Sequence, residues 1–424
     1  MKAERVFRTP DDGYQYYFGY YDKSPLNKDD RLHLALRVDF LDRLPSAEDV
    51  ATIGYFDLKK NNPIFERIAS TRAFNWQQGA MLQWLGPDHN STIIFNDLVD
   101  GRFVSRIINI ETGIERKLPL PIYAVDQSGN YAYCVDYERH YWCRRGYSYD
   151  GIANPTKNLC VVPGDGIFRM DLTSGKVEKI ISIEMMNAIE PRKSMCDGYN
   201  YLEHIMVSPS GRKIAFLHRW QNYGGIYARL YVANNDGSNI QLLNDSGRMS
   251  HFCWRTDDEL FGWGGLVNPF NKLRRYRSLA KYVVAPLLPL YRCLVSGNSV
   301  KGNSRLSSVV NGDSYILFSV DGSYARRASI PGLTKDGHPS FHPQNRQIGI
   351  TDTYPGVEHC CQLIGLDLHI GVAEKLDTLE SIVEFDESPL RCDLHPKWSY
   401  NGDFVSIDTM HEKRRGIYLY RITI

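Results

Sequence analysis

Four of the twelve histidines in the chain occupy the same position of a repeated sequence pattern, in which a polar turn begins four residues after the histidine. They are His204, His251, His338 and His395. Neutral imidazole coordinates Zn, Mn, Fe, Cu and Ni, and it accepts protons near neutral pH. A single histidine at such a position is more often a hydrogen-bonded core residue. Four in one register predict a metal or catalytic cluster.

Two aspartates lie close to these histidines in the sequence. Asp393 precedes His395 by two residues, and Asp352 lies in the segment ITDTYP that follows His338. Carboxylates beside metal-binding imidazoles commonly fix their orientation. We therefore expect both aspartates next to the histidine cluster.

A second group of reactive side chains surrounds His218, in the run AFLHRWQNYGGIYARLYV. Basic groups near an imidazole lower its pKa and favour the neutral form, which can accept a proton. The sequence therefore predicts His218 and Arg229 as catalytic residues and Arg219 as a substrate-binding residue. The alternative is that His218 is a strand-end histidine that hydrogen-bonds to a neighbouring sheet.

Further candidates for substrate binding lie near these groups in the predicted fold. Arg391 precedes His395 by four residues and could bind a carboxylate through two guanidinium nitrogens. Gln77, in FNWQQG, and Tyr354, in DTYP, are predicted to line the same face.

The elements that must position these residues form a repeat of short strands. An apolar strand runs into a Ser, Asp, Pro, Gly or Asn turn, and a second apolar strand follows at once. The copies cover residues 18–36, 81–95, 122–135, 204–217, 251–263, 338–350 and 395–407. Spacings of about 40–50 residues, with longer steps where insertions occur, are typical of propeller blades. The alternative, a β-sandwich with a second domain, explains seven copies in one register less well.

The predicted fold class is therefore all-β, a seven-bladed β-propeller that forms one domain over residues 1–424. We expect insertions in the third, fourth and fifth blades, at about 138–163, 180–200 and 266–312. The predicted blades cover approximately residues 14–60, 72–118, 119–180, 200–245, 248–330, 336–378 and 390–424. The shared histidine position begins the innermost strand, so the four imidazoles should converge on the central channel.

Composition and charge bear on partners and location. The chain has 50 basic and 49 acidic residues, and a net charge of +1 argues against a nucleic-acid-binding protein. Nine cysteines without CxxC spacing, and an opening segment without an apolar signal region, predict a reduced, cytoplasmic protein. The apolar stretch 279–295 is interrupted by Lys, Pro and Arg, so it is too short to span a membrane.

Segment 270–295 as a whole, with its basic start, could contact an anionic membrane surface or pack on the flank of the domain. The sequence does not indicate an oligomeric state.

The segments SPSGRKIAFLHRW, ARLYV, SHFCW and DLHPKWSYNGDFVSID together resemble the oligogalacturonate lyases, which are seven-bladed propellers. The resemblance covers mainly residues 200–424. It implies His218 as the base of a β-elimination, and His251 and His395 as ligands of a divalent cation, commonly manganese, with zinc as an alternative. Asp393 stands where the family has the first histidine of a late pair, and a carboxylate is also a competent ligand.

The resemblance also implies a substrate and a reaction. The substrate would be a uronate-containing oligosaccharide, cleaved by removal of the proton next to a carboxylate that the cation neutralises. One alternative is a non-catalytic glycan-binding or assembly propeller in polysaccharide metabolism. Another is a metal-dependent hydrolase or epimerase that uses the same histidines.

Overall fold

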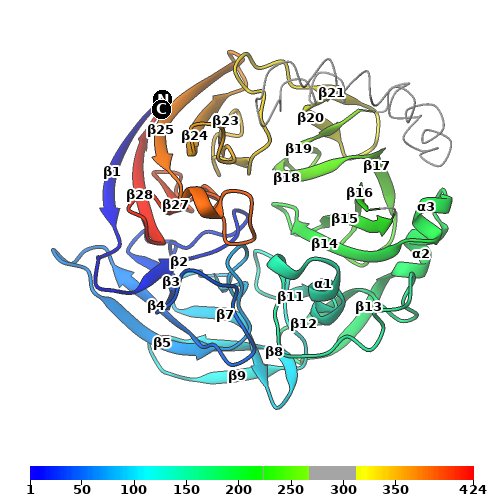
Figure 1. Cartoon of the computed structure of the whole chain (residues 1–424), viewed down its shortest axis with the longest axis horizontal. Coiled ribbons are helices and arrows are strands. Elements are labelled where there is room, and N and C mark those ends of the chain that lie inside the picture. The colour runs from blue at the N-terminus through cyan, green and yellow to red at the C-terminus, as the bar shows by residue number, and fades with distance from the viewer. Residues whose placement is uncertain (223, 267–311) are drawn as a thin grey trace.

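The computed structural model describes residues 1–222, 224–266 and 312–424. The described strands form seven four-stranded antiparallel sheets, arranged around a central axis like the blades of a propeller (Figure 1). The first strand of each sheet lies nearest the axis and the fourth lies at the rim. The all-β, seven-bladed prediction is therefore confirmed.

The blades follow one another along the chain. Blade one contains β2 (Gln15–Tyr17), β3 (Leu32–Val38), β4 (Ala51–Asp57) and β5 (Phe65–Thr71). Blade two contains β6 (Gln83–Trp84), β7 (Thr92–Val99), β8 (Arg102–Asn109) and β9 (Glu115–Leu118). Blade three contains β10 (Ala124–Val125), β11 (Tyr131–Cys134), β12 (Gly166–Asp171) and β13 (Val177–Ser182). Blades four and five contain β14 (Tyr199–Val207), β15 (Lys213–Asn222), β16 (Gly225–Asn234), β17 (Gln241–Gly247); and β18 (Met249–Thr256), β19 (Glu259–Gly265), β20 (Asp313–Ser319), β21 (Ala325–Arg327). Blades six and seven contain β22 (Ser340–Phe341), β23 (Ile348–Asp352), β24 (Cys360–Asp367), β25 (Val372–Glu380); and β26 (Lys397–Trp398), β27 (Phe404–Thr409), β28 (Gly416–Thr423), β1 (Lys2–Arg8).

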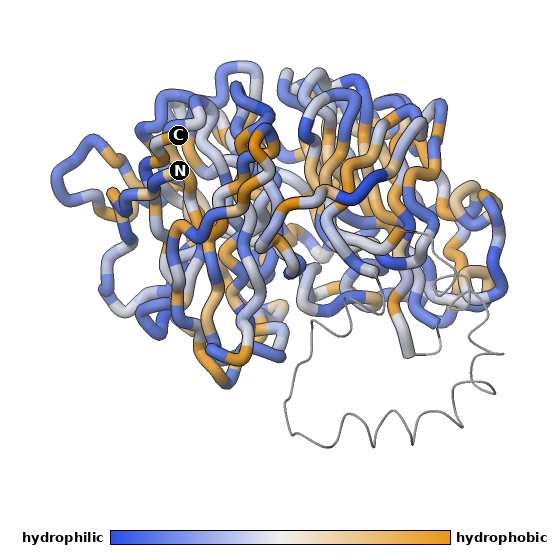
Figure 2. The backbone as a smooth tube through the Cα atoms, turned by 90° about the horizontal axis from the view of Figure 1, so that it is seen from above, coloured by the Kyte–Doolittle hydropathy of each residue, from blue (hydrophilic) through white to orange (hydrophobic). Residues whose placement is uncertain are grey.

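The middle strands of each blade are buried on both faces, because each sheet packs against its two neighbours. In β15, the seven residues from Ile214 to Trp220 are all buried, so this strand lacks the alternation of a sheet with one wet face. Figure 2 shows a similar distribution for the described residues: apolar residues are frequent in the strands, and polar residues gather at the turns.

The ring of blades is closed by the N-terminal strand. β1 pairs antiparallel with β28, from Lys2 opposite Thr423 to Arg8 opposite Tyr418, and forms the outer strand of blade seven. From the sequence, blade seven was predicted over residues 390–424, and the residues before 14 were assigned to no blade. Pairing between the two ends of the chain has no local sequence signal, since the partners are separated by the whole chain.

The described insertions lie in and after blade three. Helix α1 (Tyr137–Cys143) and the 3-10 helix η1 (Arg145–Tyr147) connect β11 to β12, and the Asp136 side chain caps α1 by accepting from the backbone N–H of Glu138 and Arg139. Helices α2 (Ile183–Ala188) and α3 (Lys193–Cys196) connect β13 to β14, and a second 3-10 helix, η2 (Val383–Phe385), precedes β26.

The third predicted insertion, 266–312, and the possible membrane contact at 270–295 fall almost entirely outside the described residues. Among the described helices, none has the length and hydropathy needed to cross a membrane.

A buried carboxyl group beside the first insertion makes stability depend on pH. Burial, with a contribution from Asp136, raises the pKa of Asp165 from 3.8 to about 7. The native state therefore binds this proton more tightly than the unfolded chain, so stability falls as pH rises from about 4 to about 7. We expect Asp165→Asn to stabilise the protein by about 2 kcal/mol at pH 8 and to leave it unchanged at pH 4, as measured by urea unfolding at both values.

Candidate functional site

The structure brings the four register histidines together around the channel axis. The ring centroids are 5.5 Å apart for His204 and His251, 4.1 Å for His251 and His338, and 4.3 Å for His338 and His395. Each residue is at most 2% exposed. Tyr20, the residue of blade one in this register, completes the circle, because its ring lies 5.3 Å from both His204 and His395.

The chain bends sharply at this register position. His204 and His395 have φ values of 54° and 45°, and Met81 of blade two has 52°. Non-glycine residues seldom adopt this left-handed conformation, which costs about 1–2 kcal/mol each. In blade four the bend coincides with a shift in strand register between Glu203 and Met206. The bend lies inside β14 in blade four and just before β26 in blade seven, so the histidine position does not begin the innermost strand of every blade as the sequence predicted.

Asp352, in β23, holds two of the histidines in place. Its carboxylate accepts hydrogen bonds from the backbone N–H of His338 at 2.7 Å and of His395 at 3.0 Å. It also lies 2.9 Å from Nδ1 of His338, which leaves Nε2 as the nitrogen free for a ligand. Burial alone would lower the pKa of His338, but the charge of Asp352 outweighs it and the pKa is raised.

The structure contains a three-residue group that fits a divalent cation. One ligand atom from each of His338, Asp393 and His395 lies within 4.8 Å of the others. Nε2 of His395 and Nε2 of His251 are buried without a hydrogen-bond partner among the described residues, a costly arrangement that a bound cation would relieve. Burial keeps the pKa of both histidines well below its usual value, so both are neutral and able to coordinate.

Arg391 and Tyr354 extend this group. Arg391 binds Asp393 through Nε at 2.5 Å and Nη2 at 2.9 Å, and its guanidinium lies 4.5 Å from the centre of the Tyr354 ring. The Tyr354 hydroxyl is 3.3 Å from Nδ1 of His251. Arg391 thus binds Asp393 in this structure, and 21% of its side chain remains exposed to solvent.

Glu203, which the sequence analysis did not select, forms a charged cluster on the other side of the ring. It is fully buried, 3.4 Å from Nδ1 of His204, and it accepts hydrogen bonds from His140 at 2.9 Å and Arg144 at 2.7 Å. Arg219 forms an ion pair with the same carboxylate. Burial opposes ionisation of Glu203, but the charges of Arg144 and Arg219 outweigh it and keep the pKa of Glu203 well below the usual value.

The segment that follows α1 and the loop that precedes β26 meet near the histidine cluster. Arg144 at the end of α1 lies over Tyr147 of η1, 3.6 Å from its ring centre. Gly146 packs so closely on Pro389, in the loop before β26, that a Cβ there would lie 3.2 Å from the proline. Blades three and seven therefore contact each other above the axial histidines.

A second carboxylate near the ring was also missed. One oxygen of Asp336 is 3.5 Å from Nδ1 of His251 and has no hydrogen-bond partner in the described part of the chain. Burial raises the pKa of this carboxyl group to about 7. Its position two residues before His338 is the only signal that the sequence carries for it.

The structure does not bring His218 and Arg229, predicted as catalytic residues, into contact with the axial cluster. Successive residues of a strand point to opposite faces, and it is Arg219, not His218, that reaches Glu203. His218 is 0% exposed, with Nε2 2.8 Å from the Asn200 side-chain oxygen. Arg229 is also 0% exposed, and it binds Asp245 and the backbone carbonyls of the segment between α2 and α3.

Gln77 is likewise a structural residue here. It is 2% exposed, and its side-chain nitrogen donates to the backbone carbonyl of Arg391 at 2.8 Å. Gln77 was predicted to bind substrate. In the structure it supports the loop that carries Arg391 and Asp393.

The fold and site together define a seven-bladed β-propeller with a histidine cluster on its axis. No family model matches the chain, and no curated protein matches it by sequence. Among solved structures it is similar to an oligogalacturonate lyase in complex with manganese, with a TM-score of 0.63 and 14% identity, over 99% of this chain and 93% of the other. It is also similar to an oligogalacturonate lyase from Vibrio parahaemolyticus, with a TM-score of 0.60 and 11% identity over the same shares of the two chains.

A hydrazine synthase structure from Kuenenia stuttgartiensis matches less closely, with a TM-score of 0.50 and 8% identity over 96% of each chain. At these identities the similarity establishes the fold. It confirms the architecture that the sequence resemblance implied.

Proposed function

We propose that this protein is a lyase that cleaves a uronate-containing oligosaccharide by metal-assisted β-elimination. The observation that carries the proposal is the group formed by His338, Asp393 and His395, with the free Nε2 of His251 beside it. The similarity to an oligogalacturonate lyase structure with manganese supports Mn²⁺ as the ion, and the nitrogen and carboxylate ligands would also accept Zn²⁺.

The chemistry of the ligand set suits this reaction. A cation held by these residues would neutralise the uronate carboxylate and make the adjacent C–H more acidic. Arg144, Arg219 and Arg391 keep 18%, 10% and 21% of their side chains exposed at the same mouth. They could bind further carboxylates of an acidic glycan through charge-assisted hydrogen bonds.

The candidate base in this arrangement is His204 in place of His218. It lies beside the ligand set without belonging to it, and its Nε2 contacts the Tyr20 hydroxyl. Burial lowers the pKa of His204 to about 3, so the imidazole is unprotonated at neutral pH.

A cytoplasmic location is part of the proposal, supported by the eight described cysteines, which are all free thiols.

The proposal is tested by incubating the protein with oligogalacturonates and other uronate oligosaccharides, with Mn²⁺ or with EDTA. We expect unsaturated products, detected by their ultraviolet absorbance, only when the metal is present. His204→Ala should lose this activity while retaining bound metal, whereas His218→Ala should keep activity in whatever fraction folds. Absence of product from every uronate substrate would exclude the lyase function.

A non-catalytic glycan-binding or assembly role is the second candidate. It is favoured by the burial of all four imidazoles, none of which is more than 2% exposed. Glycan binding without turnover, by metal-loaded protein, would support this role instead.

A further inference from the structure

A separate cavity of about 370 Å³ opens at the opposite mouth of the channel. It is lined by residues from all seven blades, at the ends of the innermost strands that lead away from the histidines. In blade seven, for example, His395 belongs to the ring, and Lys397 to Tyr400 line the cavity. A volume of this size is typical of pockets for small molecules.

Tyr21 separates the cavity from the histidine ring. Its side chain lines the cavity and also contacts His338, with ring centres 5.2 Å apart. Hydrogen bonds between its hydroxyl and the backbone of Phe252, at 2.7 Å and 3.2 Å, hold the ring in place. The two sites therefore share a wall but have different entrances.

Two cationic side chains line this cavity with unused hydrogen-bond donors. Lys397 is 1% exposed, and its Nζ makes no hydrogen bond to any described residue. Its nearest charge, Asp408, is 3.4 Å away and already accepts hydrogen bonds from the backbone N–H of Phe18 and Gly19. The Arg346 guanidinium, from blade six, also lines the cavity, and no hydrogen bond joins it to the described part of the chain.

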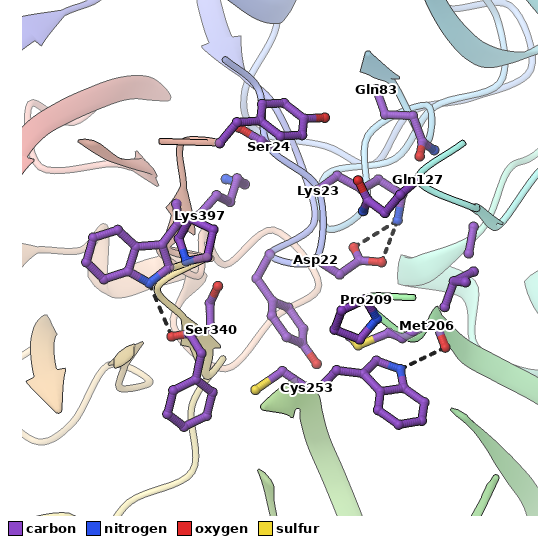
Figure 3. A pocket seen from close by; sticks show the side chains of 18 of the residues that line it. Asp22, Lys23, Ser24, Gln83, Gln127, Met206, Pro209, Cys253, Ser340 and Lys397 are labelled. Atoms are coloured by element: carbon purple, nitrogen blue, oxygen red, sulfur yellow. Dashed lines mark hydrogen bonds and ion pairs between the residues drawn. The ribbon is translucent and has the colours of Figure 1, made fainter. Parts of the chain in front are cut away.

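The other charged side chains of the cavity already have hydrogen-bond partners. Asp22 and Lys23 form an ion pair at 2.7 Å, which Figure 3 shows inside the pocket with Lys397. Asp126 accepts hydrogen bonds from its own turn, including the backbone N–H of Asn130 at 2.8 Å. The donors of Lys397 and Arg346 therefore remain unused within the described part of the chain, and an anionic group is the ligand that would satisfy both.

The rest of the lining matches hydroxyl groups. Gln83, Gln127, Ser24 and Ser340 lie around the same space, and amide and hydroxyl side chains both donate and accept hydrogen bonds (Figure 3). We propose that this mouth binds a monosaccharide-sized sugar acid, with its carboxylate at Lys397 or Arg346 and its hydroxyls toward the polar side chains. This site does not depend on the proposed lyase activity, because it involves neither the metal group nor turnover.

The test is isothermal titration calorimetry on the full chain after EDTA treatment, with galacturonate, galactose and inorganic phosphate as probes. We expect galacturonate to bind, galactose to bind at least about tenfold more weakly, and phosphate to bind more weakly than galacturonate. Lys397→Met should weaken galacturonate binding about tenfold or more. Arg346→Met should also weaken galacturonate binding about tenfold or more. Because Arg346 is only half-buried, this variant should fold even if the lysine variant folds poorly.

A control variant locates the site. Arg326→Met removes an exposed cation outside the cavity, so it should bind galacturonate as the parent does. Parental binding by Arg346→Met would overturn the proposal, and so would equal affinity for galacturonate and galactose. Equal affinity for phosphate would overturn the sugar-acid assignment. Because the protein is metal-free in this experiment, none of these outcomes depends on whether it is a lyase.

Discussion

Replacing His395 with asparagine should reduce the affinity for a divalent metal by about 100-fold or more and bring lyase activity below detection. The substitution removes the Nε2 ligand, whereas asparagine tolerates the left-handed backbone, φ 45°, that His395 adopts. Changes to residues that only support metal ligands already cost about 10–100-fold in affinity, so loss of a ligand should cost at least as much. Metal content after dialysis and the ultraviolet assay of product measure the two effects.

The matched control for this variant is His369→Asn. His369 is an exposed histidine of the turn after β24, far along the chain from the ligand group. The control should retain parental metal content and activity. If His395→Asn bound metal as the parent does, the ion would have to be held elsewhere, and the assignment of the ligand group would be wrong.

Deleting residues 1–9 should destabilise the protein by about 5 kcal/mol, a large part of the free energy of unfolding of a typical domain. The deletion removes β1 and with it the outer strand of blade seven, so the β28 backbone loses its partners from Tyr418 to Thr423. It also removes Phe7, whose ring packs against Phe56 of blade one at 5.3 Å. Both losses open the junction between the first and last blades.

Urea unfolding compares this deletion with the removal of Ile424, an exposed residue at the other end of the chain. The C-terminal control should unfold at the parental urea concentration. An unchanged midpoint for the N-terminal deletion would show that β1 does not close the ring.

The surroundings of His218 and Arg229 could not be predicted from the sequence. His218 and Arg229 are close in sequence to Arg219, and their residue types suit proton abstraction, yet only Arg219 faces the axial cluster. The segment between α2 and α3 covers Arg229 through the carbonyls of Ile189 and Glu190. Proximity along the chain does not show which face of a sheet a segment from another part of the chain will cover.

Glu203 and Tyr21 were missed for a related reason. Glu203 immediately precedes His204, but its partners come from α1 and β15, and only the folded chain brings His140, Arg144 and Arg219 to one carboxylate. Tyr21 follows the register residue of blade one, and its contacts with His338 and Phe252 cross the channel. Asp352 was identified beside the cluster because it shares a blade with His338.

The amino-acid sequence alone determined the seven-bladed architecture and the convergence of four histidines, because strand alternation, turn residues and repeat spacing are local properties. Equivalent positions of equivalent blades must then meet at the axis. The tertiary structure decided the rest: the closing strand β1, the burial of His218, the charged partners of Glu203 and the cavity beyond Tyr21. Those features depend on which side chains from distant segments come into contact, and pairwise contacts across the channel leave no periodic trace in the sequence.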